Sequence, residues 1–266
     1  MDRLLEATAR AERDHFWFRG FRRFVKPLLE ASAGGRRDLL ALDCGCGTGY
    51  NLPMLRQFGR AVGIDLTFSG LQYAVARGDR QVAQASAARL PFASERFDLV
   101  ASFDVIYGLP DDIERQAVAE MFRVLKPGGR LVLNVAALPF LRGNHSVLGG
   151  EVRRYTRPRL REALSEGGFR IDRLTYTNAF TLPITAAVRL SQRVVGHAES
   201  PAEITVPAAP LNAALAGALA LESIALQFID MPAGSSLLCL ATRPVAPGAR
   251  RQIGRRRNAS FRLPSR

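Results

Sequence analysis

The chain has 266 residues, of which 37 are Lys or Arg and 24 are Asp or Glu, so its formal net charge is +13. Hydrophobic residues make up 47% of it, a globular composition that argues against a disordered or fibrous protein. Seven arginines and no acid lie in residues 248–266, so the charge reflects a basic tail, expected to be disordered, more than a nucleic-acid-binding body. Three cysteines are too few for a disulfide framework, and no metal site is predicted.

Residues 1–38 are expected to form a helical segment that caps the binding site. Apolar residues recur at three- and four-residue steps over residues 2–31, and two glycines follow the pattern. Phe16, Trp17 and Phe18 stand together in this segment, where they either cover a pocket or pack the helix onto the body. Charges throughout the segment exclude a signal peptide, so the cytoplasm is the expected compartment.

From residue 39 onward, short apolar runs alternate with helical patterns. This alternation predicts an α/β fold with a doubly wound, Rossmann-like sheet, whose ligands bind in the loops after the strands. The expected helices cover residues 50–58, 68–77, 111–125, 157–167, 181–195 and 210–230. The expected strands cover residues 39–42, 61–64, 80–85, 97–103, 130–135, 169–176 and 236–242.

The helical pattern over residues 210–230 is almost free of charge and needs a membrane check. A helix of this length extends roughly 30 Å, which would reach across a bilayer core. Glu222 near its middle would cost about 2.5–3.5 kcal/mol in such a span. We therefore expect a helix buried on most sides, with an arginine as the partner of Glu222. A helix on a membrane surface and a true span are the alternatives.

The strongest functional signal is the loop after the first strand, with the sequence DCGCGTG. Gly45, Gly47 and Gly49 let the backbone turn tightly against a ligand, and the following helix directs its amides toward that ligand. Asp43 opens the loop, and Asp65 ends the next strand, where its carboxylate is placed to accept both hydroxyls of a ribose. The glycine spacing is D-x-G-x-G-x-G and not the dinucleotide fingerprint G-x-G-x-x-G.

Asp43 distinguishes between two adenosine cofactors. Its charge would repel the pyrophosphate of a dinucleotide but attract an ammonium group. S-adenosyl-L-methionine carries a ribose, an amino group and a sulfonium cation, and it has no phosphate. The loop therefore favours S-adenosylmethionine over a dinucleotide, and over a tight turn that binds nothing.

Five motifs in this order resemble the class I S-adenosylmethionine-dependent methyltransferases, in particular a type 11-like bacterial subgroup. After the glycine loop come V-G-I-D ending at Asp65, R-L-P-F with F-D-L-V, F-D-V around Asp104, and R-V-L-K-P-G-G. The resemblance covers about residues 39–176. It implies a seven-stranded sheet with an antiparallel last strand, and a methyltransferase domain over residues 39–247 with a helical insertion at about 178–232.

The resemblance also implies which residues bind the cofactor. The glycines would line its methionine part, Asp65 would hold the ribose, and Leu66 and Ala87 would flank the adenine. Ser86 stands where relatives usually have an acid, which departs from the pattern. The full predicted cofactor set is Asp43, Gly45, Cys46, Gly47, Gly49, Asp65, Leu66, Ser86, Ala87, Phe103 and Asp104.

Acceptor residues are expected in the loops after the fourth and fifth strands. His145 and Tyr107 are the candidates for acid–base catalysis, although His145 alternatively contacts substrate or solvent and Tyr107 alternatively forms a pocket wall. Arginines around residue 155 either bind an anionic acceptor or form a solvated helix start. The predicted substrate contacts are Trp17, Tyr107, His145, Arg153, Arg154 and Tyr155.

These features predict methyl transfer to a small acceptor that is hydrophobic or lipid-like, with a lipid-linked or anionic acceptor as one option. The expected partners are that acceptor and, through the tail, a membrane surface. A non-catalytic protein that binds the cofactor is the first alternative, because Tyr107-Gly108 stands where many relatives have Glu-His. A nucleic-acid methyltransferase is the second, motivated only by the basic tail.

Overall fold

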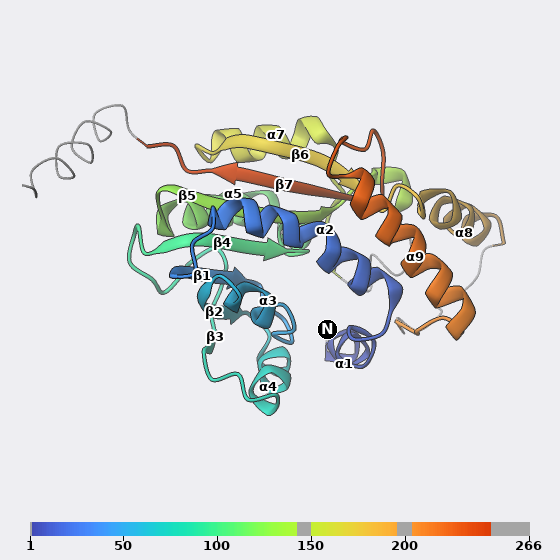
Figure 1. Cartoon of the computed structure of the whole chain (residues 1–266), viewed down its shortest axis with the longest axis horizontal. Coiled ribbons are helices and arrows are strands. Elements are labelled where there is room, and N and C mark those ends of the chain that lie inside the picture. The colour runs from blue at the N-terminus through green and yellow to red at the C-terminus, as the bar shows by residue number, and fades with distance from the viewer. Residues whose placement is uncertain (1, 143–149, 196–203, 246–266) are drawn as a thin grey trace, which may run out of the picture.

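The computed structural model, which describes residues 2–142, 150–195 and 204–245, is built on one seven-stranded sheet (Figure 1). The strand order is β3-β2-β1-β4-β5-β7-β6, and β7 runs antiparallel to both of its neighbours. The predicted doubly wound sheet with an antiparallel last strand is thus confirmed. The strands are β1 Leu39–Cys44, β2 Gly59–Asp65, β3 Val82–Gln84, β4 Phe97–Phe103, β5 Leu125–Ala136, β6 Arg170–Thr177 and β7 Ser236–Thr242.

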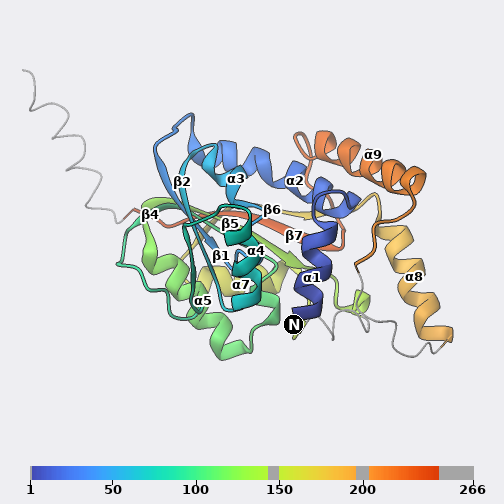
Figure 2. The same cartoon turned by 90° about the horizontal axis from the view of Figure 1, so that it is seen from below.

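Helices cover both faces of this sheet. Figure 2 shows α2 and α3 on one face and α5 and α7 on the other. Both faces of the central strands are therefore buried, which explains why β1, β4 and the second half of β5 consist mainly of apolar residues. The helices are α1 Asp2–Ala11, α2 Phe16–Ala33, α3 Leu52–Arg56, α4 Phe68–Ala76, α5 Asp111–Val124, α7 Arg157–Glu166, α8 Leu182–Val195 and α9 Ala209–Ala225.

The N-terminal segment is two helices and not the single helix that its periodicity predicts. The chain turns between α1 and α2, and His15 begins α2 by accepting a hydrogen bond at Nδ1 from the Trp17 backbone N–H at 3.1 Å. This contact satisfies one of the unpaired amides at the start of the helix. The turn directs α1 toward α4 and the glycine loop, whereas α2 continues over the sheet and along α9.

The expectation that the helix near residues 210–230 is buried on most sides is wrong. One face of α9 packs against α2 so closely that a Cβ added at Gly20 would lie 2.3 Å from Leu219 Cδ1. Asn212 joins the same interface, accepting from the Phe16 N–H and donating to the Asp14 carbonyl. The opposite face, including Leu221 and Ile224, is exposed. No helix in the described ranges combines the length and the apolar character needed to cross a bilayer.

Glu222 also has different partners from the arginine that the sequence predicts. Its side chain is completely buried, and its two carboxylate oxygens accept hydrogen bonds from the backbone N–H groups of Ala179 and Phe180, each at 3.0 Å. Burial raises the pKa of this carboxyl group, while the two amides oppose that rise. Glu222 therefore fastens α9 to the segment that leads into α8.

Candidate active site

The glycine loop lies at the carboxyl end of β1, where the strand order reverses between β1 and β4. Gly45, Gly47 and Gly49 all have positive φ angles, of 85°, 52° and 76°. A Cβ at Gly45 would lie 2.2 Å from Val105 Cγ2, so this position has no space for a side chain. A Cβ at Gly47 would meet only Leu5, at 3.9 Å. The backbone at Gly47 is consequently open to close approach by a ligand.

Asp43 is fully buried at the base of this loop and has no hydrogen-bond partner for either carboxylate oxygen. Burial, and next the charge of Asp65, raise the pKa of Asp43 to about 7. A buried carboxylate without a partner is costly, and a cationic ligand would relieve that cost. The ammonium group of S-adenosylmethionine fits this requirement, and a pyrophosphate does not.

Asp65 is held in place by the loop that it is predicted to serve. Its Oδ2 accepts from the Gly47 backbone N–H and its Oδ1 from the Thr67 N–H, both at 2.8 Å. A carboxylate has about four acceptor positions, so two remain for the hydroxyls of a ribose. The amide bonds fix the orientation of the carboxylate before a ligand arrives, and the ribose contact itself stays a prediction.

The residues predicted to surround the adenine lie at the ends of β2 and β3. Leu66 is exposed, and Ala87 and Ser86 are half-buried. Ser86 Oγ accepts from the Ala88 N–H at 3.2 Å, so the hydroxyl is already engaged in its own turn. A cavity of about 410 Å³ lies between α4 and β3, lined by residues that include Phe68 and Gln84. Two further predicted residues, Cys46 in the glycine loop and Phe103 at the end of β4, are buried.

The N-terminal helices contact the glycine loop through a buried polar network that sequence reasoning missed. Glu12 accepts from Thr48 Oγ1 at 2.6 Å and from the Arg77 guanidinium at 2.9 Å. Arg77 also donates to the Thr48 carbonyl, and the Arg22 guanidinium lies over the ring of Tyr50. Burial raises the pKa of Glu12 although Arg77 acts in the opposite direction.

A second polar cluster, which we call the Asp104 cluster, lies at the carboxyl ends of β4 and β5. It consists of Asp104, Tyr107, Asn134, Glu151 and Arg154. Asn134 Nδ2 donates to Asp104 Oδ1 at 3.0 Å, and Arg154 Nε donates to Glu151 Oε1 at 2.9 Å. Asp104 has a φ of 60°, a strained conformation for a residue other than glycine.

Electrostatics give the acids of this cluster distinct properties. Burial raises the pKa of Asp104 to about 7, with the Asn134 hydrogen bond and the charge of Arg154 opposing that rise. Burial and the nearby charges of Asp104 and Glu151 raise the pKa of Tyr107. Near neutral pH, Asp104 therefore exchanges a proton far more readily than the Tyr107 phenol does. Asn134 was missed from the sequence, although it is the one polar residue in the apolar run L-V-L-N-V of β5.

Three of the predicted acceptor contacts, Tyr155, Arg153 and Trp17, make contacts within the protein. Tyr155 is 0% exposed and donates its hydroxyl to Glu114 Oε1 at 2.6 Å, so the expectation that it lines the acceptor site is wrong. Arg153 is paired with Glu114 and Asp111, at 2.8 and 2.7 Å, and serves the packing of α5. Trp17 is half-buried and stacks on Phe21 with ring centroids 5.7 Å apart. His145 lies outside the described residues.

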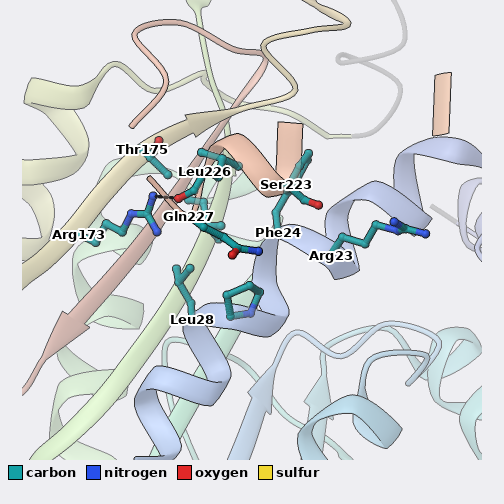
Figure 3. A pocket seen from close by; sticks show the side chains of 10 residues that line it. Arg23, Phe24, Leu28, Arg173, Thr175, Ser223, Leu226 and Gln227 are labelled. Atoms are coloured by element: carbon teal, nitrogen blue, oxygen red, sulfur yellow. Dashed lines mark hydrogen bonds between the residues drawn. The ribbon is translucent and has the colours of Figure 1, made fainter. Parts of the chain in front are cut away.

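A smaller cavity lies between α2, α9 and β6 (Figure 3). Its volume is about 30 Å³, which holds a water molecule or two and no organic acceptor. The acceptor therefore has to bind outside this cavity. The Asp104 cluster, at the strand ends next to the glycine loop, remains the candidate acceptor site.

Comparison with known proteins agrees with this geometry. Residues 42–133 match the family described as "Methyltransferase domain". The chain carries a class I S-adenosylmethionine-dependent methyltransferase domain. The matched stretch begins in β1 and ends in β5, so it contains the glycine loop, Asp65 and Asp104. The cofactor of this family is S-adenosylmethionine.

Relatives of the methyltransferase domain share its core over part of their length. A Mycolicibacterium smegmatis protein named a probable S-adenosylmethionine-dependent methyltransferase is 31% identical over 163 residues, which are 60% of this chain and 61% of the relative. The ubiquinone/menaquinone biosynthesis C-methyltransferase UbiE of Syntrophotalea carbinolica is 36% identical over 155 residues, 54% of this chain and 60% of the relative. In both cases the match spans less than two thirds of the relative.

At the level of fold, the chain is similar to the crystal structure of an S-adenosylmethionine-dependent methyltransferase from Mesorhizobium loti. The TM-score is 0.53 at 19% identity, and the match covers 82% of this chain and 96% of that one. This likeness shows the same fold.

Proposed function

We propose that the protein transfers a methyl group from S-adenosylmethionine to a small apolar acceptor, in an in-line displacement. The observation that carries this proposal is the fully buried, unpartnered carboxylate of Asp43 at the base of an open glycine loop. When bound, S-adenosylmethionine supplies an electrophilic methyl group on a sulfonium, and the electrons of the broken carbon–sulfur bond stay on sulfur. Asp43 and Asp65 would hold the ammonium group and the ribose.

Asp104 is the proton acceptor in this proposal. An oxygen or carbon acceptor of high pKa must lose a proton as its electron pair forms the new bond to carbon, and that proton would pass to the Asp104 carboxylate. Asp104 directly follows β4, the neighbour of β1 in the sheet, and the Asn134 amide fixes one of its oxygens. Its pKa of about 7 lets it accept a proton and release it again near neutral pH. Tyr107 then forms a wall of the acceptor pocket.

An acceptor of hydroquinone or phenol type with an apolar substituent fits this arrangement best. Such rings carry a hydroxyl proton for Asp104, and a relative of the chain is named for C-methylation in ubiquinone and menaquinone biosynthesis. Arg153 is paired with two acids and Arg154 with Glu151, so the arginines predicted to bind an anionic acceptor are occupied within the protein. We therefore favour an acceptor without phosphate.

The first test is calorimetry with S-adenosylmethionine on the wild type and on Asp65→Ala. Binding by the wild type that is lost in the variant supports cofactor use. If neither protein binds, the function fails. The second test incubates the enzyme with methyl-labelled cofactor, a panel of hydroquinones and a lipid extract. Label in a small lipophilic product supports methyl transfer, whereas binding without any transfer points to the non-catalytic alternative. Label only in nucleic acid would contradict the acceptor class.

We place this activity in a reducing compartment and take the cytoplasm as that compartment. All three cysteines, Cys44, Cys46 and Cys239, are buried and unpaired. Free thiols of this kind are ordinary in reducing surroundings. In a redox titration, added reductant should not unfold the purified protein. That result would agree with this assignment.

A further inference from the structure

The helical insertion between β6 and β7 carries most of the exposed apolar surface of the described residues. Fifteen large apolar side chains are exposed among the described residues, and ten of these belong to the insertion. Phe228 is the most exposed of all, at 81%. We call these ten the apolar face: Phe180, Ile184, Val188, Leu190, Val206, Leu211, Leu221, Ile224, Phe228 and Ile229.

The apolar face lies beside the mouth of the proposed site. Figures 1 and 2 both place α8 and α9 at one end of the molecule, beyond the carboxyl ends of the parallel strands. Arg189 of α8 lies within electrostatic range of Arg154 and Glu151 in the Asp104 cluster, and burial lowers its pKa. One side of α8 thus adjoins the cluster while Ile184 and Val188 point to solvent.

The charges around the apolar face are those of a surface that meets anions. Among the described residues from Arg173 to Asp230, the two acids are Glu222, which is completely buried and bonded to two amides, and Asp230, which is paired with Arg173 at 2.8 Å. On the α2 side, Arg23 is exposed, and Figure 3 shows its guanidinium directed away from the cavity and from Arg173.

We propose that the apolar face of α8 and α9 inserts shallowly into the surface of an anionic lipid bilayer. The exposed Phe, Leu and Ile side chains lie beside exposed basic residues, and the acid next to them, Asp230, is paired with Arg173 at 2.8 Å. This combination is that of an interfacial helix pair. A second copy of the chain is the less fitting occupant, because two surfaces of the same positive sign would repel each other. The inference rests on the proposed function in one respect: the bilayer would be the source from which a lipophilic acceptor reaches the Asp104 cluster.

Vesicle flotation with the full chain tests the proposal. The probes are phosphatidylcholine vesicles with and without a minority of phosphatidylglycerol. The wild type is expected to float with the mixed vesicles, and the variant Phe228→Ser with Ile229→Ser is expected to bind them roughly tenfold more weakly. Val75→Ser is the matched control, since Val75 is an exposed apolar residue on α4, outside the apolar face. Residues 248–266 remain in all proteins, so any difference reports on the apolar face and not on the basic tail.

The outcomes separate the proposal from its rivals. Because Phe228 and Ile229 are exposed, the double variant should keep the wild-type melting temperature and S-adenosylmethionine affinity. A second variant, Ile184→Ser with Val188→Ser on α8, should also bind vesicles more weakly. Equal flotation of wild type and both variants, or no flotation of the wild type, would overturn the inference. A wild-type dimer that becomes monomeric in the variants would assign the face to a second copy. Cofactor binding without flotation leaves the proposed function standing.

Discussion

The strand-end site and the α8–α9 insertion each contain buried carboxylates, and the carboxylates differ in what they bind. In the insertion, Glu222 receives two backbone N–H groups and joins two pieces of the chain. At the strand ends, Asp104 receives one side-chain amide on one oxygen, and Asp43 receives nothing. A satisfied buried charge is part of the architecture, whereas an unsatisfied one has been kept at a cost to stability. The pattern of partners therefore separates support from function within one molecule.

The largest effect is expected for Asp104→Asn, which removes the proposed proton acceptor while keeping the shape of the side chain. Turnover should fall by about 10²- to 10⁴-fold, the usual contribution of general-base catalysis. The affinity for S-adenosylmethionine should stay unchanged. In the wild type, turnover should rise as the pH rises through about 7, because Asp104 must be deprotonated to accept a proton. Steady-state kinetics over pH, with the hydroquinone that accepts label, measure both effects. Full activity of Asp104→Asn would remove Asp104 from the chemistry.

Glu222→Ala tests the buried carboxylate of the α8–α9 insertion. The Ala179 and Phe180 amides would lose a charged acceptor inside the protein, so the free energy of unfolding should fall by about 3 kcal/mol. Urea denaturation measures this loss. Glu222→Gln, which keeps one acceptor oxygen, should lose about half as much. Cofactor affinity should not change in either variant, and a stable Glu222→Ala protein would show that the carboxylate does not fasten α9 to α8.

Asp43→Asn should give the reverse pattern. The affinity for S-adenosylmethionine should fall roughly 100-fold, or about 2.7 kcal/mol, because the ammonium group loses its counter-charge. The free energy of unfolding should stay within about 1 kcal/mol of the wild type or increase, since a buried charge without a partner is removed. Calorimetry and thermal unfolding report the two quantities separately. Loss of stability without loss of affinity would assign Asp43 to the architecture.

The smallest expected effect is a proton released when the cofactor binds. With a pKa of about 7, Asp43 is roughly half protonated at pH 7, and a cation placed beside it lowers that pKa. Binding at pH 7 should therefore release roughly half a proton. Calorimetry in phosphate and in Tris, whose ionisation enthalpies differ, detects the release as a difference in apparent enthalpy. The Asp43→Asn protein should show no such difference, and a wild type without it would contradict the raised pKa.

Local sequence predicts the parts of this protein whose structure depends on local chemistry. The glycine loop needs positive φ angles at Gly45, Gly47 and Gly49, which only glycine adopts at little cost. The spacing of the glycines in the sequence is therefore enough to locate the loop. The apolar runs of β1, β4 and β5 likewise predict buried strands, because a strand covered on both faces has no polar side. The break between α1 and α2 was not predicted, since the apolar periodicity continues across it and histidine is an uncommon residue at a helix N-cap, where His15 stands.

The sequence by itself determined the alternation of strands and helices, the cofactor loop and the positions of Asp43 and Asp65, because these follow from periodicity and from the conformations that glycine permits. The antiparallel last strand was expected only from the resemblance to the methyltransferase family. Only the tertiary structure decided the partner of each long polar side chain. Arg153 pairs with Glu114 across 39 positions of sequence, Glu222 with amides 43 and 42 positions away, and Asp104 with Asn134 across 30. It also decided that α9 exposes Leu211, Leu221 and Ile224, since periodicity shows which residues share a face and not whether another part of the fold covers that face.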